Sequence, residues 1–216
     1  MGTETQESHW EYSVNEWEQG DYFKTITSIL KKENIKNFID IGANVGGVSF
    51  VLLKNIPSIE TGYLFEPQKD NFNYLFNKLK NLNKFVFLNC GIHYGKKYQN
   101  AIKPAFSHVG GYTVVDNFSS DFFESDEPFH LFELEFFNFK PIDFVKMDIE
   151  GGEYNIIENS TFLQTVKYID IELHRDYDEN YIQKYFPNHH IIWYSKYWNN
   201  NIGDYDVNHV FLKKNN

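Results

Sequence analysis

The amino-acid sequence predicts an α/β protein with a doubly wound, mostly parallel sheet of seven strands and helices on both faces. Three observations support this fold class. Short apolar runs alternate with amphipathic segments over most of the chain, a glycine-rich turn follows the first apolar run, and two β-rich runs close the sequence. Strands that alternate with helices are typical of parallel sheets, because the helix provides the crossover connection.

The first half of the chain shows these units clearly. Between Trp10 and Lys32 apolar residues recur at helical spacing, so we expect one or two helices before the first strand. Pro57 is expected to end the first helix of the sheet region, because proline cannot continue a helix. The predicted order is then strand, helix, strand, helix and strand, over 37–42, 46–56, 61–67, 69–82 and 84–92.

The second half contains a strand over 141–150, a helix over 151–163 and a strand over 167–174. The runs 189–198 and 206–214 are joined by an Asn- and Gly-rich turn and predict an antiparallel hairpin at the sheet edge.

Residues 93–140 break the alternating pattern and are too long for a plain connection. They are either a lid, a binding loop or small added strands, and His108 within them is a candidate acceptor contact. The expected organisation is an N-terminal helical extension over 1–36 and one main domain over 37–216, with 93–140 as an inserted acceptor or lid region.

Composition excludes several classes of protein. The chain has 216 residues, with 20 Lys and Arg against 30 Asp and Glu, and a formal net charge of −10, which disfavours nucleic acid and anionic membranes as partners. Cys90 is the only cysteine, so an intramolecular disulfide and a cysteine-based zinc site are excluded. No apolar run is long enough to span a bilayer, and the first ten residues lack the apolar core of a signal peptide. We therefore expect a soluble, cytoplasmic protein.

The segment FIDIGANVGGVS (38–49) predicts a nucleotide-type ligand site. Asp40 lies at the end of a strand, Gly42, Asn44 and Gly46 form the turn, and a helix follows. Ligands of doubly wound folds bind beyond the carboxyl ends of the strands, and a helix N-terminus there favours an anionic group. Glu66 ends the second strand, 24 residues after Gly42, where an acidic residue can bind a ribose diol.

This turn alone does not decide between cofactors, because NAD-dependent dehydrogenases also combine a glycine-rich turn with a later acidic residue that binds the ribose. The turn reads G-A-N-V-G-G rather than G-x-G-x-x-G, which disfavours the dinucleotide.

A second polar cluster follows from strand alternation. Lys146, Asp148 and Glu150 share one face of the strand over 141–150, and Asp170, Glu172 and His174 share one face of the strand over 167–174. If these two strands are neighbours, four side chains converge beside the cofactor site: Asp148, Glu150, Glu172 and His174. The alternative is a set of strand-end polar residues that bind loop amides.

Such a cluster can activate a hydroxyl group. A hydroxyl is a poor nucleophile and needs a base, for which Glu150 or Glu172 comes first and His174 next. The same four residues are candidate ligands of Mg²⁺ or Mn²⁺, which would lower the pKa of the hydroxyl. Most other histidines, His9 and His209 among them, lack ligand spacing and are expected at surface or hairpin positions.

Four segments together, FIDIGANVGGVS, YLFEP, FVKMDIEGGEYNII and IELH, resemble the FkbM-type family of class I S-adenosylmethionine-dependent methyltransferases. The resemblance covers about residues 37–175 and implies a Rossmann-like fold and S-adenosylmethionine as cofactor. It implies that Glu66 binds the ribose hydroxyls and that Asn89 and Gly91 lie near the adenine. The residues implied for the methionine part are Asp40, Gly42, Asn44 and Gly46, with Asp148 as a further candidate for the ammonium group.

The family commonly methylates sugar hydroxyls of glycans or glycosylated metabolites, so the resemblance implies an O-methyltransferase with a carbohydrate acceptor. Three other functions stay open: a methyltransferase with a non-sugar acceptor, an NAD-dependent oxidoreductase and a non-catalytic binding module that uses its acidic, aromatic insertion. A homodimer also stays open.

Overall fold

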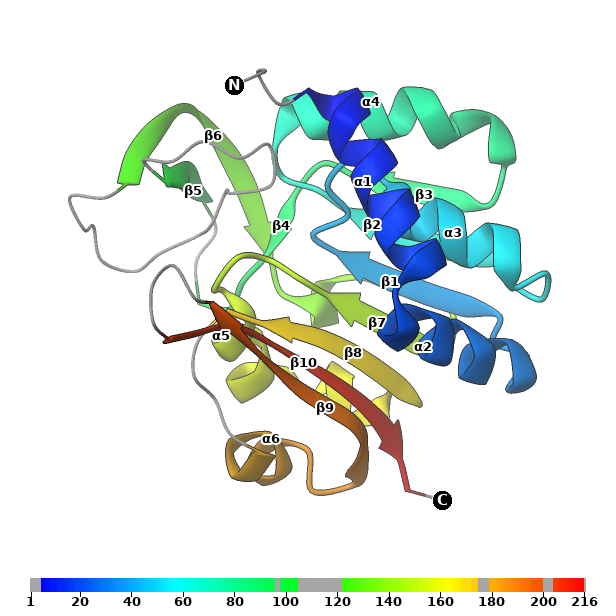
Figure 1. Ribbon diagram of the computed structural model, residues 1–216. Coiled ribbons are helices and arrows are strands. Elements are labelled where there is room, and N and C mark those ends of the chain that lie inside the picture. Colours follow the sequence, from blue (N-terminus) through cyan, green and yellow to red (C-terminus); the bar gives the residue numbers. More distant parts are fainter. Residues whose placement is uncertain (1–4, 96–97, 105–121, 175–178, 200–203, 216) are drawn as a thin grey trace.

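The computed structural model describes residues 5–95, 98–104, 122–174, 179–199 and 204–215. The main sheet contains seven strands in the order β3-β2-β1-β7-β8-β10-β9 (Figure 1). The first five of these are parallel, and β10 is antiparallel to both β8 and β9, so the predicted sheet and its C-terminal hairpin are confirmed. The strands are β1 (Asn37–Ile41), β2 (Thr61–Phe65), β3 (Phe85–Leu88), β7 (Phe144–Met147), β8 (Tyr168–Leu173), β9 (His189–Asn199) and β10 (Asp204–Lys214).

Helices cover both faces of this sheet, as predicted (Figure 1). They are α1 (Gln6–Gln19), α2 (Asp21–Lys32), α3 (Gly47–Asn55), α4 (Lys69–Leu79), α5 (Glu153–Asn159) and α6 (Glu179–Tyr185). Short 3₁₀ helices add η1 (Lys80–Leu82), η2 (Leu134–Phe136) and η3 (Phe162–Thr165). The helix α6 was not expected from the sequence.

Strand alternation divides the core in two. Phe38, Phe144 and Tyr168 pack with α1 to α4, whereas their neighbours Ile39 and Val145 pack with α5 and α6 on the other face. Each of these five side chains is fully buried. The strands read as continuous apolar runs because both faces of a parallel sheet are covered.

The two N-terminal helices belong to the same packing. Trp17 of α1 and Phe23 and Leu30 of α2 are buried in the cluster that contains Phe38 of β1. Tyr22 of α2 donates a hydrogen bond of 2.5 Å to the Asp170 carboxylate in β8. The helices α1 and α2 therefore pack on the main sheet.

The predicted third strand over 84–92 is broken into two. β3 ends at Leu88, and β4 (Gly91–Ile92) joins a second sheet of order β4-β6-β5 with β5 (Tyr98–Pro104) and β6 (Phe122–Phe132). The Asn89 side chain donates to the carbonyl oxygens of Glu66 and Pro67, and the Cys90 N–H donates to the Leu88 carbonyl. The two Asn89 bonds hold the segment between β3 and β4 against the residues that follow β2.

The described residues of the segment over 93–140 include the strands β5 and β6, and its role as an acceptor or lid region stays a prediction. His108 and the segment GGYTVV (110–115) lie outside the described residues. No helix in the described part of the chain is both long and apolar enough to cross a bilayer.

Candidate functional site

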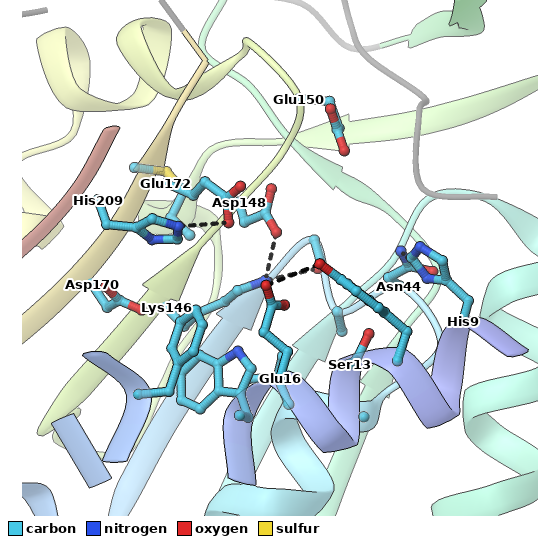
Figure 2. Close-up of a pocket in the computed structure, with 18 residues that line it drawn as sticks. His9, Ser13, Glu16, Asn44, Lys146, Asp148, Glu150, Asp170, Glu172 and His209 are labelled. Carbon is cyan, nitrogen blue, oxygen red and sulfur yellow. Dashed lines mark hydrogen bonds and ion pairs between the residues drawn. The ribbon is translucent and has the colours of Figure 1, made fainter. Parts of the chain in front are cut away.

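A cavity of about 180 Å³ lies where the carboxyl ends of β1, β7 and β8 meet α1. Figure 2 shows Ser13 and Glu16 projecting from α1 on one side of it, opposite Lys146 and Asp148 from the sheet. Pockets for small molecules usually measure about 300–1,000 Å³, so this cavity is smaller than a typical pocket for a whole ligand.

The glycine turn forms one wall of the cavity. Gly42 has φ +82° and Gly46 has φ +89°, backbone conformations that favour glycine. A Cβ on Gly42 would lie 1.8 Å from the backbone oxygen of Asp148, and one on Gly46 would lie 2.9 Å from a methyl carbon of Leu79. These glycines therefore let the chain's own segments pack closely, and the close approach at Gly42 brings Asp148 beside the turn.

Gly47 has the same role toward α1. A Cβ there would lie 2.8 Å from the Ser13 Cβ and 3.3 Å from the Trp10 carbonyl oxygen. Because Gly47 has no side chain, α1 can lie directly against the start of α3. In this position α1 forms one wall of the cavity. The second glycine of the G-G pair thus serves helix packing.

Lys146 lies at the centre of a charged row across three strands. The register places it between Asp40 of β1 and Asp170 of β8. Its Nζ lies 3.6 Å from Asp40 and 3.3 Å from Asp148, and it donates to the Gly42 carbonyl oxygen. Burial alone would lower the Lys146 pKa, but Asp148 and Asp40 raise it, so the ammonium group stays charged.

Asp40 lies beneath the cavity. It is fully buried, accepts a hydrogen bond of 2.7 Å from Ser49 and pairs with Lys146. Burial raises the pKa of its carboxyl group. The sequence placed this carboxylate against the ammonium group of the cofactor, whereas in the structure its charged partner is Lys146.

Glu66 closes the other side of the turn. Its two carboxylate oxygens accept the backbone N–H groups of Asn44 and Gln68, each at 2.8 Å. Burial raises the pKa of Glu66 to about 7. Among the predicted cofactor residues, Gly42, Asn44 and Asp148 line the cavity, whereas Gly46, Glu66, Asn89 and Gly91 lie outside its lining.

Four carboxylates surround His174, just beyond β8. Its Nε2 lies 3.4 Å from Glu150, 3.8 Å from Asp148 and 3.9 Å from Glu172. Its Nδ1 lies 3.0 Å from Glu153. The structure brings these four predicted residues together, but not by strand alternation alone. The predicted strand over 141–150 ends at Met147, so Asp148 and Glu150 lie in the turn that follows it, and His174 lies just after Leu173.

The carboxyl groups of this cluster have different proton affinities. Burial, and then the charge of Asp148, raise the pKa of Glu150 to about 7. Burial raises that of Glu172 well above its usual range. For Asp148 the charges of Lys146 and His174 outweigh burial and lower the pKa.

His174 is a cation at neutral pH in this arrangement. Burial alone would lower its pKa, but the hydrogen bond and charge of Glu153, with the other carboxylates, raise it to about 10. An imidazolium cannot accept a proton, so the geometry favours a carboxylate as base. His174 then balances the negative charge around it.

Three further residues belong to the site that sequence reasoning missed. His209 of β10 is buried beside Glu172, 3.7 Å away, because the antiparallel register pairs the two residues. It was expected at a hairpin position without a function, and burial lowers its pKa to about 4. Glu16 and Ser13 line the cavity from α1, and no sequence signal linked that helix to the strand ends.

A fourth missed residue, Glu153, stands inside the motif KMDIEGGE and could have been noticed there. Its carboxylate, that of Asp148 and the His174 ring offer ligand atoms that lie within 4.8 Å of one another. Of the four predicted metal candidates, this grouping includes Asp148 and His174 but neither Glu150 nor Glu172.

Three solved structures resemble the fold. TrmK of M. capricolum, in complex with S-adenosyl-homocysteine, is 14% identical with a TM-score of 0.50, covering 83% of this chain and 62% of that one. The N-methyltransferase NodS of Bradyrhizobium japonicum is 9% identical with a TM-score of 0.52, covering 94% and 98%. The methyltransferase FkbM of Methylobacillus flagellatus is 18% identical with a TM-score of 0.49, covering 82% and 44%. The chain thus spans less than two thirds of the first and third of these proteins.

No curated protein sequence shows a significant match. Identities this low show similarity of fold alone. A family model described as the methyltransferase FkbM domain, however, matches residues 40–197, which include the glycine turn, the end of β2, the carboxylate cluster and His174. On that match over most of its length, the chain belongs to the FkbM methyltransferase domain family.

Proposed function

We propose that this protein is an S-adenosylmethionine-dependent O-methyltransferase that methylates a hydroxyl group of a sugar in a glycan or glycosylated metabolite. The observation that supports the reaction type most strongly is the group of Asp148, Glu150 and Glu172 around His174, beside the glycine turn. The choice of a sugar acceptor rests on the family resemblance.

The cavity suits the methionine end of the cofactor. Its lining includes the carboxylates of Glu16, Asp148 and Glu172, which favour ammonium and sulfonium cations. The side-chain oxygen of Asn44 is buried and accepts no hydrogen bond from the described residues, so it is a suitable acceptor for an ammonium group. When bound, the cofactor supplies an electrophilic methyl group.

Glu150 is the best placed general base. Its side chain is 39% exposed, so it reaches solvent at the edge of the cluster. A base is most effective when its pKa lies near the working pH, and the Glu150 pKa is about 7. Glu150 would accept the hydroxyl proton, while the positive charge of His174 balances the carboxylates around it. The ion pair of Lys146 and Asp148 would fix the side of the site that faces the cofactor.

A divalent cation is compatible with the same residues. Oxygen ligands and one imidazole suit Mg²⁺ or Mn²⁺. Binding would require the imidazole to lose its proton, so metal affinity would increase with pH. A turnover rate that chelators leave unchanged would remove the metal from this proposal.

The alternatives are less well supported. An NAD-dependent oxidoreductase is disfavoured by the family match and by the Asn44 position in the turn. Some proteins of this fold act on RNA, but the net charge of −10 opposes binding to a polyanion. A homodimer and a cytoplasmic location stay predictions.

The first test is a calorimetric titration with S-adenosylhomocysteine, run beside NADH. Micromolar binding of the former by the wild type, weakened at least about tenfold in Glu66→Ala, would support the cofactor site. Glu60→Ala, an exposed carboxylate that pairs with Lys36, is the matched control and should bind like the wild type. Binding of NADH instead would contradict the proposal.

The acceptor is then sought with methyl-labelled cofactor and a panel of free sugars, glycosides and glycan fragments. Label in the ether fraction of a sugar would support O-methylation of a carbohydrate. If label appears only in amine or other non-sugar products, the acceptor is not a sugar hydroxyl, but the cofactor assignment still holds.

A further inference from the structure

Glu153 is a buried carboxylate at the first position of α5, and its side chain is 1% exposed. Charged side chains are rarely buried unless they are paired. One oxygen of this group, Oε1, lies within hydrogen-bond distance of three nitrogens: the backbone N–H of Ile149 at 3.1 Å, the backbone N–H of Gly151 at 3.1 Å and Nδ1 of His174 at 3.0 Å.

The two backbone donors flank Glu150. Glu150 has φ +57°, a left-handed conformation that residues with a side chain rarely adopt, and Gly151 follows with φ +104°. Such a conformation persists only where the surroundings hold it. The bonds from Ile149 and Gly151 to Glu153 tie down the backbone on both sides of Glu150, so they hold its carboxylate at the edge of the site.

The third bond sets the orientation of the imidazole. With Nδ1 directed at Glu153, Nε2 of His174 faces the open side of the cluster, where Glu150, Asp148 and Glu172 lie at 3.4–3.9 Å. A carboxylate bonded to the far nitrogen of a histidine fixes the ring in the same way in many enzyme sites.

We propose that Glu153 is a positioning residue that holds both Glu150 and His174 in place for proton removal from the acceptor. Its Oε1 contacts three groups of the protein, so its effect on the reaction passes through the two residues that it holds. This inference rests on the proposed methyltransferase function, because it assigns Glu150 and His174 a part in that reaction.

The test uses Glu153→Ala and Glu153→Gln in the full chain. Glu158→Ala is the matched control, because Glu158 is an exposed carboxylate on the same helix. The first measurement needs no acceptor: amide hydrogen exchange at Ile149 and Gly151, with the ¹⁵N resonances of the His174 ring. In Glu153→Ala both amides should lose at least about tenfold protection and the ring resonances should shift, whereas the amides of β7 and β8 stay protected.

The second measurement separates positioning from general loss of structure. Removing a partner that orients a catalytic group typically costs about 10- to 100-fold in activity, so kcat of Glu153→Ala should fall by that factor, with the acceptor found in the sugar screen. Its KM for S-adenosylmethionine and its Kd for S-adenosylhomocysteine should stay near the wild-type values. Glu153→Gln retains an acceptor oxygen and should recover part of the protection and of kcat.

The double variant Glu153→Ala with Glu150→Gln completes the test. Residues that act through one another lose activity non-additively, so the loss in this variant should be smaller than the product of the two single losses. Unchanged protection at Ile149 and Gly151, or losses that multiply, would overturn the inference. If Glu153→Ala does not fold, Glu153→Gln carries the same comparison.

Failure of the proposed function gives a different pattern. If S-adenosylhomocysteine does not bind the wild type, while the amide and ring signals change in the Glu153 variants, then the hydrogen bonds are real but the reaction is wrong. If S-adenosylhomocysteine binds and the signals do not change, the function stands and Glu153 is not a positioning residue.

Discussion

At the scale of single residues, the site depends on carboxyl groups whose pKa values are moved in opposite directions. The pKa values of Glu150 and Asp170 are both raised to about 7. Burial raises both, and the charge of Asp148 contributes next at Glu150. The pKa of Asp148 is lowered, because the charges of Lys146 and His174 outweigh the effect of burial. Neighbouring carboxyl groups with different pKa values are typical of acid–base sites, since one group can exchange a proton while the other keeps its charge.

This division makes the pH dependence of the reaction testable. Only the deprotonated carboxylate of Glu150 can accept a proton, so kcat should rise as the pH increases through about 7 and then level off. Glu150→Gln should lower kcat roughly 100-fold or more, because a general base typically contributes about 10²–10⁴. The measurement is a profile of kcat against pH for both proteins with saturating S-adenosylmethionine. A wild-type profile that falls over this range, or a Gln variant with the wild-type rate, would contradict the assignment.

At the scale of secondary-structure elements, α1 determines the shape of the cavity. It contributes Tyr12, whose hydroxyl donates to Glu16, and both side chains line the cavity. The helix can lie this close because Gly47, the first residue of α3, has no side chain. Two elements far apart in the sequence thus share one wall through a single glycine.

Gly47→Ala tests this contact. The new Cβ would lie 2.8 Å from the Ser13 Cβ, so α1 must shift or tilt away from the turn. Because an added methyl in a packed interface costs about 1–3 kcal/mol, we expect a lower melting temperature together with at least about tenfold weaker binding of S-adenosylhomocysteine. Thermal unfolding and calorimetry are the measurements.

The second-site change Ser13→Gly removes the opposing Cβ. Combined with Gly47→Ala it should recover part of the binding, although the Trp10 carbonyl oxygen stays near the new methyl group. If Gly47→Ala binds S-adenosylhomocysteine like the wild type, α1 does not help to form the cofactor site.

At the scale of the whole molecule, the net charge of the chain bears on which acceptors it can bind. The chain has a net charge of −10, and the described residues that line the cavity include five carboxyl groups and one lysine. Binding to a polyanion needs Lys and Arg to neutralise phosphates, and this distribution opposes it.

We therefore expect no binding to RNA at physiological salt. Proteins with only non-specific affinity bind nucleic acid with Kd values of roughly 10⁻⁴–10⁻⁶ M, and this chain should bind more weakly than that range. Fluorescence anisotropy with a labelled transfer RNA, repeated at low and high salt, is the measurement. Tight binding that weakens steeply with salt would reopen RNA as the acceptor.

The sequence by itself determined the fold class and the order of the seven strands of the main sheet, but not α6 or the second sheet. The periodicity of apolar residues was sufficient to predict the seven strands of the main sheet, the helices on both faces and the terminal hairpin. Each of these patterns reflects local burial. The sequence also predicted that Asp148, Glu150, Glu172 and His174 converge. Three of them, Asp148, Glu150 and His174, lie just beyond the ends of β7 and β8, where strand alternation does not apply.

Only the tertiary structure decided what these residues contact. Asp40 pairs with Lys146, the Glu66 carboxylate accepts the backbone N–H of Asn44, and Gly47 makes room for α1. Glu153 stands in the motif KMDIEGGE, but its contact with His174 appears only in the folded chain, and His209 joins the cluster through a strand register that no local pattern reveals. Contacts between segments far apart in the sequence depend on how the whole chain packs, and a carboxylate's partner and pKa depend on that packing.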